Sequence, residues 1–401
     1  MFAGSYNLSA INGMNINLLL SKISSDENLN DIYLTKKIWT RNNKTYQIVK
    51  YCKNLIHVNN IQNNPLGLFR SIIFSNNKIN VFSPPKSIEK NLFFSQYAEG
   101  DCIAEEFVEG TMINLFYDVD IGKWDISSKT TIGANVSFFK EQPTFSELFF
   151  DICEELGISF ENLPRDICYS FVMQHPKNRL VIPIKFKKLY LITAFHINND
   201  HYIISEVPRE NLIQMDIKNI EFPKRFEIET FKDLATTYGF MNQSANIMGI
   251  VIRHRNGDRT KIRNTNYEYI KNIRGNNCKL QYTYLSLRKV GNVKQYLKYF
   301  PGDIEKFTEY RKHVHDVTDT LHLNYINCFV KKEKKLVDYP YQFRPHMYHL
   351  HQYYLSMKQE NKKINKDTVI NYINNLHPSK LMYFLNYHMR DLAKQHTCME
   401  I

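Results

Sequence analysis

The chain has 401 residues, and its 43% of hydrophobic residues supports a folded core and excludes global disorder. The formal net charge of +12 favours a polyanionic partner, with nucleic acid ahead of a membrane surface. Seven scattered cysteines without a Cys-x-x-Cys pair are typical of a reducing compartment, and no window approaches ~20 continuous apolar residues, so we expect a cytoplasmic protein without a membrane span or membrane partner.

Residues 1–45 show only weak periodicity, and their fold cannot be assigned from the sequence. From about residue 46 the strand pattern strengthens, and the sequence favours β-strands over 45–52 and 71–83, the second interrupted by a turn at Asn76-Asn77. The run TMINLFYD, 111–118, predicts a strand, and the turn after it predicts a partner strand over 123–133.

A helix is predicted to begin at Thr144, because Glu147 completes a capping box and apolar residues follow at helical spacing to residue 156. Strands are then predicted over 168–174, 179–186 and 189–197. The last of these should pair with residues 201–207 across Asn198-Asn199-Asp200.

The dipeptide Asn256-Gly257 separates two β runs, 249–255 and 259–263, and predicts a type I′ hairpin. Beyond about residue 275 the pattern becomes helical, mainly over 302–330 and 345–400, with Asp367 as an N-cap and Pro378 in the first turn of the last helix. We therefore predict an α+β protein. Its parts are an N-terminal segment of unknown fold (1–45), an antiparallel β-rich body (46–275) and a helical C-terminal domain (276–401).

Residues 253–299 contain twelve Lys or Arg but only two acidic residues, so this window contributes +10 to the net charge. Six tyrosines are interleaved with the cations. Cations neutralise phosphates and aromatic rings stack on unpaired bases, so the window favours binding of single-stranded RNA or a nucleoside triphosphate. The alternative is that the charges lie on solvated faces and the tyrosines pack in the core.

Five short motifs follow one another over residues 80–275. They are Phe107-Val108-Glu109-Gly110 before the strand 111–118, Lys129 to Gly133 after Trp124, Tyr169 to Val172 followed by Pro176 to Arg179, Met248 to Val251, and Lys261-Ile262-Arg263. In this order they resemble the motifs of the covalent nucleotidyltransferase superfamily, specifically the T4 RNA ligase 1-like RNA ligases, including RNA-ligase-like proteins of giant DNA viruses.

This resemblance implies an antiparallel, ATP-grasp-like nucleotidyltransferase body and a nucleotide such as ATP or GTP with Mg²⁺ as cofactor. In the family a lysine amine attacks the α-phosphate, but Phe107 stands at that position and carries no nucleophile. Val172 and Met248 stand where the family has carboxylates, and neither offers an oxygen ligand for Mg²⁺. The resemblance therefore implies no catalytic or metal-binding residue. Together with Arg253 of the basic window, it predicts a nucleotide- or RNA-binding set of Phe107, Glu109, Gly110, Lys129, Arg179, Lys261 and Arg263.

The resulting hypothesis is a catalytically degenerate RNA-ligase-like protein that binds RNA, a nucleotide or an RNA 5′ end such as a cap or triphosphate. One alternative is an active ATP-dependent RNA ligase that uses a displaced lysine, Lys123 or Lys90. Another is an assembly protein with a filled pocket, whose helical C-terminal domain binds a protein partner. The viral resemblance implies that the compartment is a host cytoplasm or a viral factory.

Overall fold

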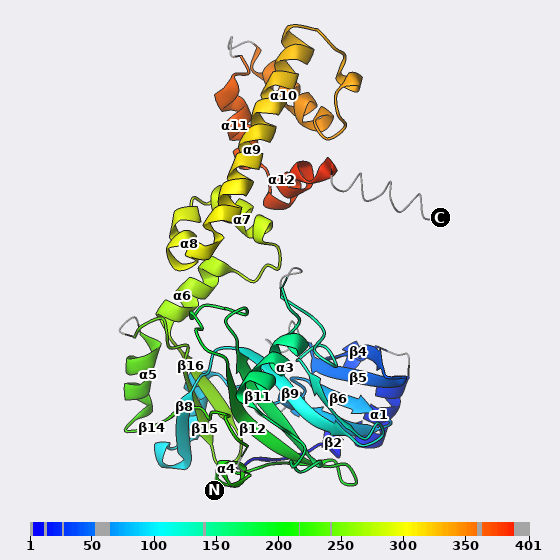
Figure 1. Ribbon diagram of the computed structural model, residues 1–401, viewed down its shortest axis with the longest axis vertical. Coiled ribbons are helices and arrows are strands. Elements are labelled where there is room, and N and C mark those ends of the chain that lie inside the picture. Colours follow the sequence, from blue (N-terminus) through cyan, green and yellow to red (C-terminus); the bar gives the residue numbers. More distant parts are fainter. Residues whose placement is uncertain are drawn as a thin grey trace. The chain divides into compact units, whose positions relative to one another are not determined.

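The computed structural model describes residues 3–11, 14–25, 28–52, 65–138, 142–215, 217–240, 243–358 and 363–388. The chain divides into two compact units, residues 1–271 and 272–401 (Figure 1). Antiparallel sheets form most of the first unit, and helices form the second, which confirms the predicted α+β class with a helical C-terminal region.

The first unit contains a six-stranded sheet with the order β1-β13-β12-β11-β9-β10, a four-stranded sheet β14-β8-β15-β16 and a four-stranded sheet β4-β5-β6-β7. A short pair, β2-β3, completes the set. The strands are β1 (Ser5–Asn7), β2 (Ala10–Ile11), β3 (Met14–Asn15), β4 (Leu34–Arg41), β5 (Lys44–Tyr51), β6 (Ile72–Ser75), β7 (Lys78–Phe82), β8 (Cys102–Glu106), β9 (Thr111–Asp118), β10 (Lys123–Ser127), β11 (Ile167–Gln174), β12 (Lys188–Asn198), β13 (Ile203–Glu206), β14 (Arg225–Phe226), β15 (Gly249–His254) and β16 (Arg259–Arg263).

The helices follow the sequence pattern closely where a cap and an apolar stripe coincide. In α3 the Thr144 hydroxyl accepts from the Glu147 backbone N–H at 3.2 Å, which confirms the predicted capping box, and Phe149 and Ile152 are fully buried. The helices are α1 (Ile16–Ser24), α2 (Lys90–Gln96), α3 (Phe145–Leu156), α4 (Arg209–Gln214), α5 (Phe231–Gly239), α6 (Thr265–Arg274), α7 (Leu280–Lys289), α8 (Val293–Tyr299), α9 (Ile304–Tyr325), α10 (Arg344–Ser356), α11 (Lys366–Asn375) and α12 (Pro378–Leu385).

Residues 1–45 belong to the first unit. Strand β1 pairs with β13 at the edge of the six-stranded sheet. Leu19 and Ile23 of α1 share a hydrophobic core with Val49 and Ile72 of the β4-β5-β6-β7 sheet. These contacts join residues far apart in the sequence, so local periodicity carries no sign of them.

The predicted strand over 179–186 is wrong. Residues 179–187 have no strand hydrogen bonding, because the backbone N–H groups of Val181 and Ile182 donate to the buried Glu109 carboxylate at 3.0 Å instead. The partner strand predicted over 123–133 is also shorter, since β10 ends at Ser127 and only an isolated bridge joins Ser127 to Ile132.

The hairpin at Asn256-Gly257 exists, but the predicted type I′ turn is wrong. A type I′ turn needs positive φ at both central residues, whereas only Gly257 of the pair has it, at 93°. His254 pairs with Asp258 through a backbone bond of 2.8 Å, leaving a three-residue loop with glycine in its last position. Type I′ φ values occur instead at Asn42-Asn43 and Asn76-Asn77.

In the second unit, Pro378 lies in the first turn of α12 as predicted, but the predicted N-cap at Asp367 is wrong. The cap of α11 is Asn365, whose side chain accepts from the Thr368 N–H at 2.8 Å. Helical residues predicted beyond 388 lie outside the described residues. Within the described part of the chain, no helix is both long and apolar enough to cross a membrane.

Candidate phosphate-binding site

Strand β16 carries three cations on one face. Side chains alternate along a strand, so Arg259, Lys261 and Arg263 point to the same side. Thr260 and Ile262 point to the other side, where both are buried. The edge strand therefore presents a row of positive charge on one face.

The register of the sheet brings this row to Phe107. Lys261 lies opposite Val251, and Arg263 lies opposite Gly249, whose carbonyl accepts the Phe107 N–H at 3.0 Å. The Lys261 Nζ is 4.3 Å from the centre of the Phe107 ring, and the Arg263 guanidinium carbon is 5.8 Å from it. The first and last of the five sequence motifs thus meet in space.

Two glycines allow the backbones around Phe107 to approach closely. A Cβ at Gly110 would collide with the Met173 carbonyl and the Val172 side chain, and its φ of 153° is one that other residues rarely adopt. At Gly249, with φ of 138°, a Cβ would collide with the Ile262 carbonyl. Gly110 therefore allows its backbone to pack against Val172 and Met173 of β11, where a larger residue would collide.

The amine of Lys261 lies among other cations. Within the described residues no carboxylate forms an ion pair with it. Burial, followed by the guanidinium groups of Arg259, Arg70 and Arg263, lowers its pKa to about 6. A lysine in this state gains its charge when an anion approaches.

Three residues near this row, Arg70, Tyr51 and Lys86, were not predicted from the sequence as site residues. Arg70 acts electrostatically on both Lys261 and the Tyr51 ring, and the Lys86 Nζ lies 5.5 Å from the centre of that ring. Burial lowers the pKa of Arg70 and of Lys86. No family motif covers them; the only local indication is Pro84-Pro85, which breaks the strand pattern just before Lys86.

Lys129 belongs to the same neighbourhood, since its Nζ lies 5.9 Å from the Tyr51 ring centre and its side chain is exposed. Its backbone carbonyl accepts the Ser71 hydroxyl at 3.0 Å. We call Arg70, Lys86, Arg259, Lys261 and Arg263 the cation cluster.

Arg259 anchors the cluster to the neighbouring segment. Its buried guanidinium donates to the carbonyl oxygens of Pro84 and Pro85, with contacts of 3.0 Å. Burial and the nearby Arg70 lower its pKa. Neutral carbonyl partners orient this charge without cancelling it.

Glu109 is a structural carboxylate. It is 2% exposed and accepts backbone N–H groups from the loop after β11, as well as a hydrogen bond from Tyr267. Its own backbone carbonyl accepts the Gln174 amide at 2.8 Å. These partners occupy the oxygens that a cation would need.

Arg253 lies in a separate buried network. It pairs with Glu206 and lies 3.6 Å from Glu105, which also pairs with Arg209 and Arg225 at 3.2 and 3.4 Å. These carboxylates neutralise Arg253. Although it shares a sheet face with the cation cluster, it adds little uncompensated charge.

Arg179 lies in the loop that Glu109 holds. Its Nε donates to the Val181 carbonyl at 3.0 Å, and the preceding Asn178 donates to the Thr111 hydroxyl at 2.8 Å. Arg179 therefore lies in the loop after β11, the strand whose residues Val172 and Met173 approach Gly110.

The residues around Phe107 do not fit the Mg²⁺ site that the resemblance implies. Val172 packs with Val108 and Tyr190 in a small apolar cluster. Within the described ranges, no group of three or more His, Cys, Asp or Glu side chains could hold a metal ion. Hard divalent cations need oxygen ligands, which the side chains of Val172 and Val108 do not offer.

Among solved structures, the chain is similar to three ligases. An archaeal ATP-dependent RNA ligase is 13% identical, covers 74% of each chain and has a TM-score of 0.37. A mutant Naegleria gruberi RNA ligase with ATP and Mn is 11% identical, with a TM-score of 0.36 over 58% of this chain and 76% of that one. A putative ATP-dependent DNA ligase from Aquifex aeolicus is 13% identical, with a TM-score of 0.37 over 79% and 77%.

Among curated proteins, the chain is similar to the immediate-early protein ICP-46 homolog of Invertebrate iridescent virus 3. The two are 22% identical over 286 residues, which is 67% of this chain. The chain matches 58% of the length of that relative. No family model matches the chain.

Proposed function

We propose that the first unit binds a phosphorylated ligand, the 5′ end of an RNA or a nucleotide, through the cation cluster and without forming a covalent bond to it. The observation that carries this proposal is the Lys261 amine, half-buried among guanidinium groups and without a carboxylate partner in the described residues. Leaving a charge desolvated and unpaired is costly. A phosphate that enters the cluster supplies the missing counter-charge and accepts several hydrogen bonds at once.

Phe107 supports the non-covalent part of the proposal. Its ring lies beside the amine at 4.3 Å and has no nucleophilic atom. The other lysines considered from the sequence are not neighbours of this ring in any described contact: Lys90 begins α2 and Lys123 begins β10, and both side chains are exposed. A base that follows the bound phosphate would find an aromatic face at Phe107.

The first experiment compares RNA ends on the full-length protein. We expect an oligonucleotide with a 5′-triphosphate to bind more tightly than the same strand with a 5′-hydroxyl, measured by fluorescence anisotropy. Lys261→Met should weaken triphosphate binding by roughly 10- to 100-fold, the range of one charge-assisted hydrogen bond. Equal affinity of wild type and variant would contradict the proposal.

A matched control is Lys224→Met. Lys224 is an exposed lysine whose Nζ also lies over a phenylalanine ring, 5.6 Å from the centre of Phe226, on the opposite edge of the same sheet. It lies outside the cation cluster, so its replacement should leave the preference for the 5′-triphosphate unchanged.

The second experiment tests covalent chemistry. After incubation with labelled ATP or GTP and Mg²⁺, denaturing electrophoresis should show no label on the protein. A labelled band, mapped by mass spectrometry to a lysine, would replace this proposal with an active nucleotidyltransferase.

A further inference from the structure

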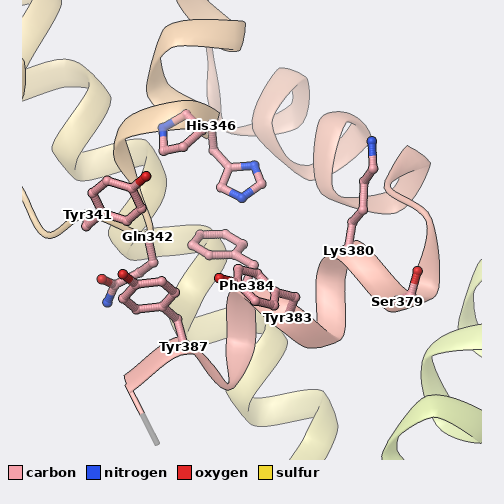
Figure 2. Close-up of a pocket in the computed structure, with 9 residues that line it drawn as sticks. Tyr341, Gln342, His346, Ser379, Lys380, Tyr383, Phe384 and Tyr387 are labelled. Carbon is pink, nitrogen blue, oxygen red and sulfur yellow. The ribbon is translucent and has the colours of Figure 1, made fainter. Parts of the chain in front are cut away.

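The second unit contains a pocket that none of the five motifs touches. It has a volume of about 310 Å³ and lies between the beginning of α10 and the helix α12. Figure 2 shows the aromatic side chains that surround it. Its principal residues are Tyr341, His346, Lys380, Tyr383, Phe384 and Tyr387. We call this the tyrosine pocket.

Flat rings form the walls of the tyrosine pocket. Phe384 is 3% exposed, and the His346 ring lies 4.0 Å from it, at an angle of 30°. Tyr341 and Tyr387 stack with ring centres 5.8 Å apart. Tyr341 lines the pocket and is 62% exposed, so solvent also reaches this side chain.

His346 contributes a ring face and no charge. Its Nδ1 shares a hydrogen bond of 2.8 Å with the Tyr372 hydroxyl. Burial, followed by the neighbouring His349, lowers its pKa to about 4, so the ring is neutral at physiological pH. The inner wall is therefore uncharged and suited to a neutral, planar group.

The rim and the unit around it are basic. Lys380 lines the pocket, the Arg344 guanidinium carbon lies 5.8 Å from the centre of the Tyr341 ring, and no acidic residue is among the described lining residues. Residues 272–401 contain 21 Lys and Arg against 11 Asp and Glu, a net charge of +10 out of the total of +12. The occupant must therefore combine a planar ring with negative charge.

We propose that the tyrosine pocket binds one unstacked base of single-stranded RNA, with the flanking phosphates held near Lys380 and Arg344. Aromatic faces bind bases of any sequence because every base has a π-face, and a basic rim follows the backbone. An aromatic or proline side chain of a protein partner would fill the same walls but would leave the cations of the rim without a counter-charge. This inference does not depend on the cation cluster of the first unit.

The test uses the full-length protein and a short oligouridine with a 5′-hydroxyl, so that recognition of a phosphorylated end plays no part. Tyr341→Ala should weaken binding by roughly 5- to 150-fold, the range for losing one base stack. An abasic strand of the same length should bind wild type and variant equally, because it offers charges without bases.

The matched control is Tyr348→Ala on α10. Tyr348 is 51% exposed, close to Tyr341 in exposure, but it does not line the pocket. It should bind oligouridine like the wild type, and Lys261→Met should do the same. Because Lys261→Met tests the cation cluster and Tyr341→Ala tests the tyrosine pocket, either proposal can fail without the other.

A direct readout comes from 4-thiouridine placed within the oligonucleotide and irradiated in the complex. Mass spectrometry should find the crosslink on the peptides that contain Tyr341 or Tyr383. Three results would overturn the inference: crosslinks confined to other peptides, equal losses for Tyr341→Ala and Tyr348→Ala, or a loss that also appears with the abasic strand. Release of a bound aromatic or proline-rich peptide, with oligouridine binding unaffected by Tyr341→Ala, would assign the pocket to a protein partner instead.

Discussion

Lys261 and Phe107 illustrate how one position changes the role of its neighbour. A lysine beside an aromatic ring gains a modest cation–π attraction, but three guanidinium groups nearby oppose its protonation. Burial, followed by these guanidinium groups, lowers the pKa of the amine to about 6, so an arriving anion changes its charge. Binding and protonation are coupled at this residue.

Affinity for a phosphorylated end should consequently depend on pH. Below pH 6 the amine is already charged in the unliganded protein, so its contribution is constant. Above pH 6 binding must take up a proton, and affinity should fall by up to roughly tenfold per pH unit until the higher pKa of the bound state is reached. Anisotropy titrations from pH 5 to 9 measure the slope.

Lys261→Met is the control for that titration. The ligand phosphate titrates equally in both proteins, so the difference between the two slopes belongs to the amine. Parallel slopes would show that Lys261 takes up no proton on binding.

The same residue should destabilise the unliganded protein. Between pH 6 and 10.5 the folded amine is neutral while the unfolded one is protonated, so the unfolded state binds more protons. The free energy of unfolding therefore rises with pH across this window, and the destabilisation by Lys261 is greatest at its lower end, near pH 6. Lys261→Met should raise the free energy of unfolding at pH 7 by about 1 kcal/mol. Urea unfolding measures this, and a loss of stability would indicate a purely structural lysine.

The sequence predicted which types of side chain lie at the site, but it could not predict which residues they contact. The order of motifs selects Glu109 and Lys261 from the sequence, and the basic window selects Arg253. It does not reveal that Glu109 binds backbone groups of Val181 and Ile182, or that Arg253 meets Glu206. Those partners lie far along the chain, and only the folded sheets bring them together.

At the scale of elements, the β15–β16 hairpin shows what alternation determines. Side chains alternate along a strand, and this alone places Arg259, Lys261 and Arg263 on one face of β16. The turn type was wrong because Gly257 supplies its positive φ in a three-residue loop, packed against Gly4 and Tyr6. Those two residues come from the N-terminal segment that local pattern could not place.

Arg253 on β15 connects the β14-β8-β15-β16 sheet to Glu206 on β13 of the six-stranded sheet, and its removal should destabilise the fold. Its side chain is 16% exposed and that of Glu206 is 4% exposed, so Arg253→Met leaves a buried carboxylate without its cation. We expect the free energy of unfolding to fall by about 3 kcal/mol, the lower end for breaking a buried pair. Denaturant unfolding of the full chain measures this loss.

Arg255→Met provides the comparison two residues further along. Arg255 pairs with Asp101, but the two side chains are 58% and 43% exposed. The loss there should stay below about 1 kcal/mol. Similar losses for both variants would contradict a structural role for the Arg253 network.

At the scale of the whole molecule, charge is divided unequally. The first unit carries a net charge of +2, the remainder after the +10 of residues 272–401. The basic window 253–299 is itself split between the units, and several of its members are paired, such as Arg263 and Lys271 with Glu268. The net charge of the chain predicted a polyanionic partner, but it could not predict which of the two units carries most of that charge.

This division predicts which residues control the salt dependence of RNA binding. Lys332, Lys334 and Lys335 are exposed lysines of the second unit. Replacing all three with glutamine should reduce the slope of log affinity against log salt by roughly 2, about 0.7 for each phosphate of a single strand that a lysine no longer neutralises. The preference for a 5′-triphosphate should persist, because the cation cluster is intact.

The matched control replaces three exposed lysines of the first unit, Lys78, Lys123 and Lys218, and should change the slope little. Equal changes in the two triple variants would mean that RNA is attracted by the net charge of the chain and not by the helical unit, since both variants remove the same total charge.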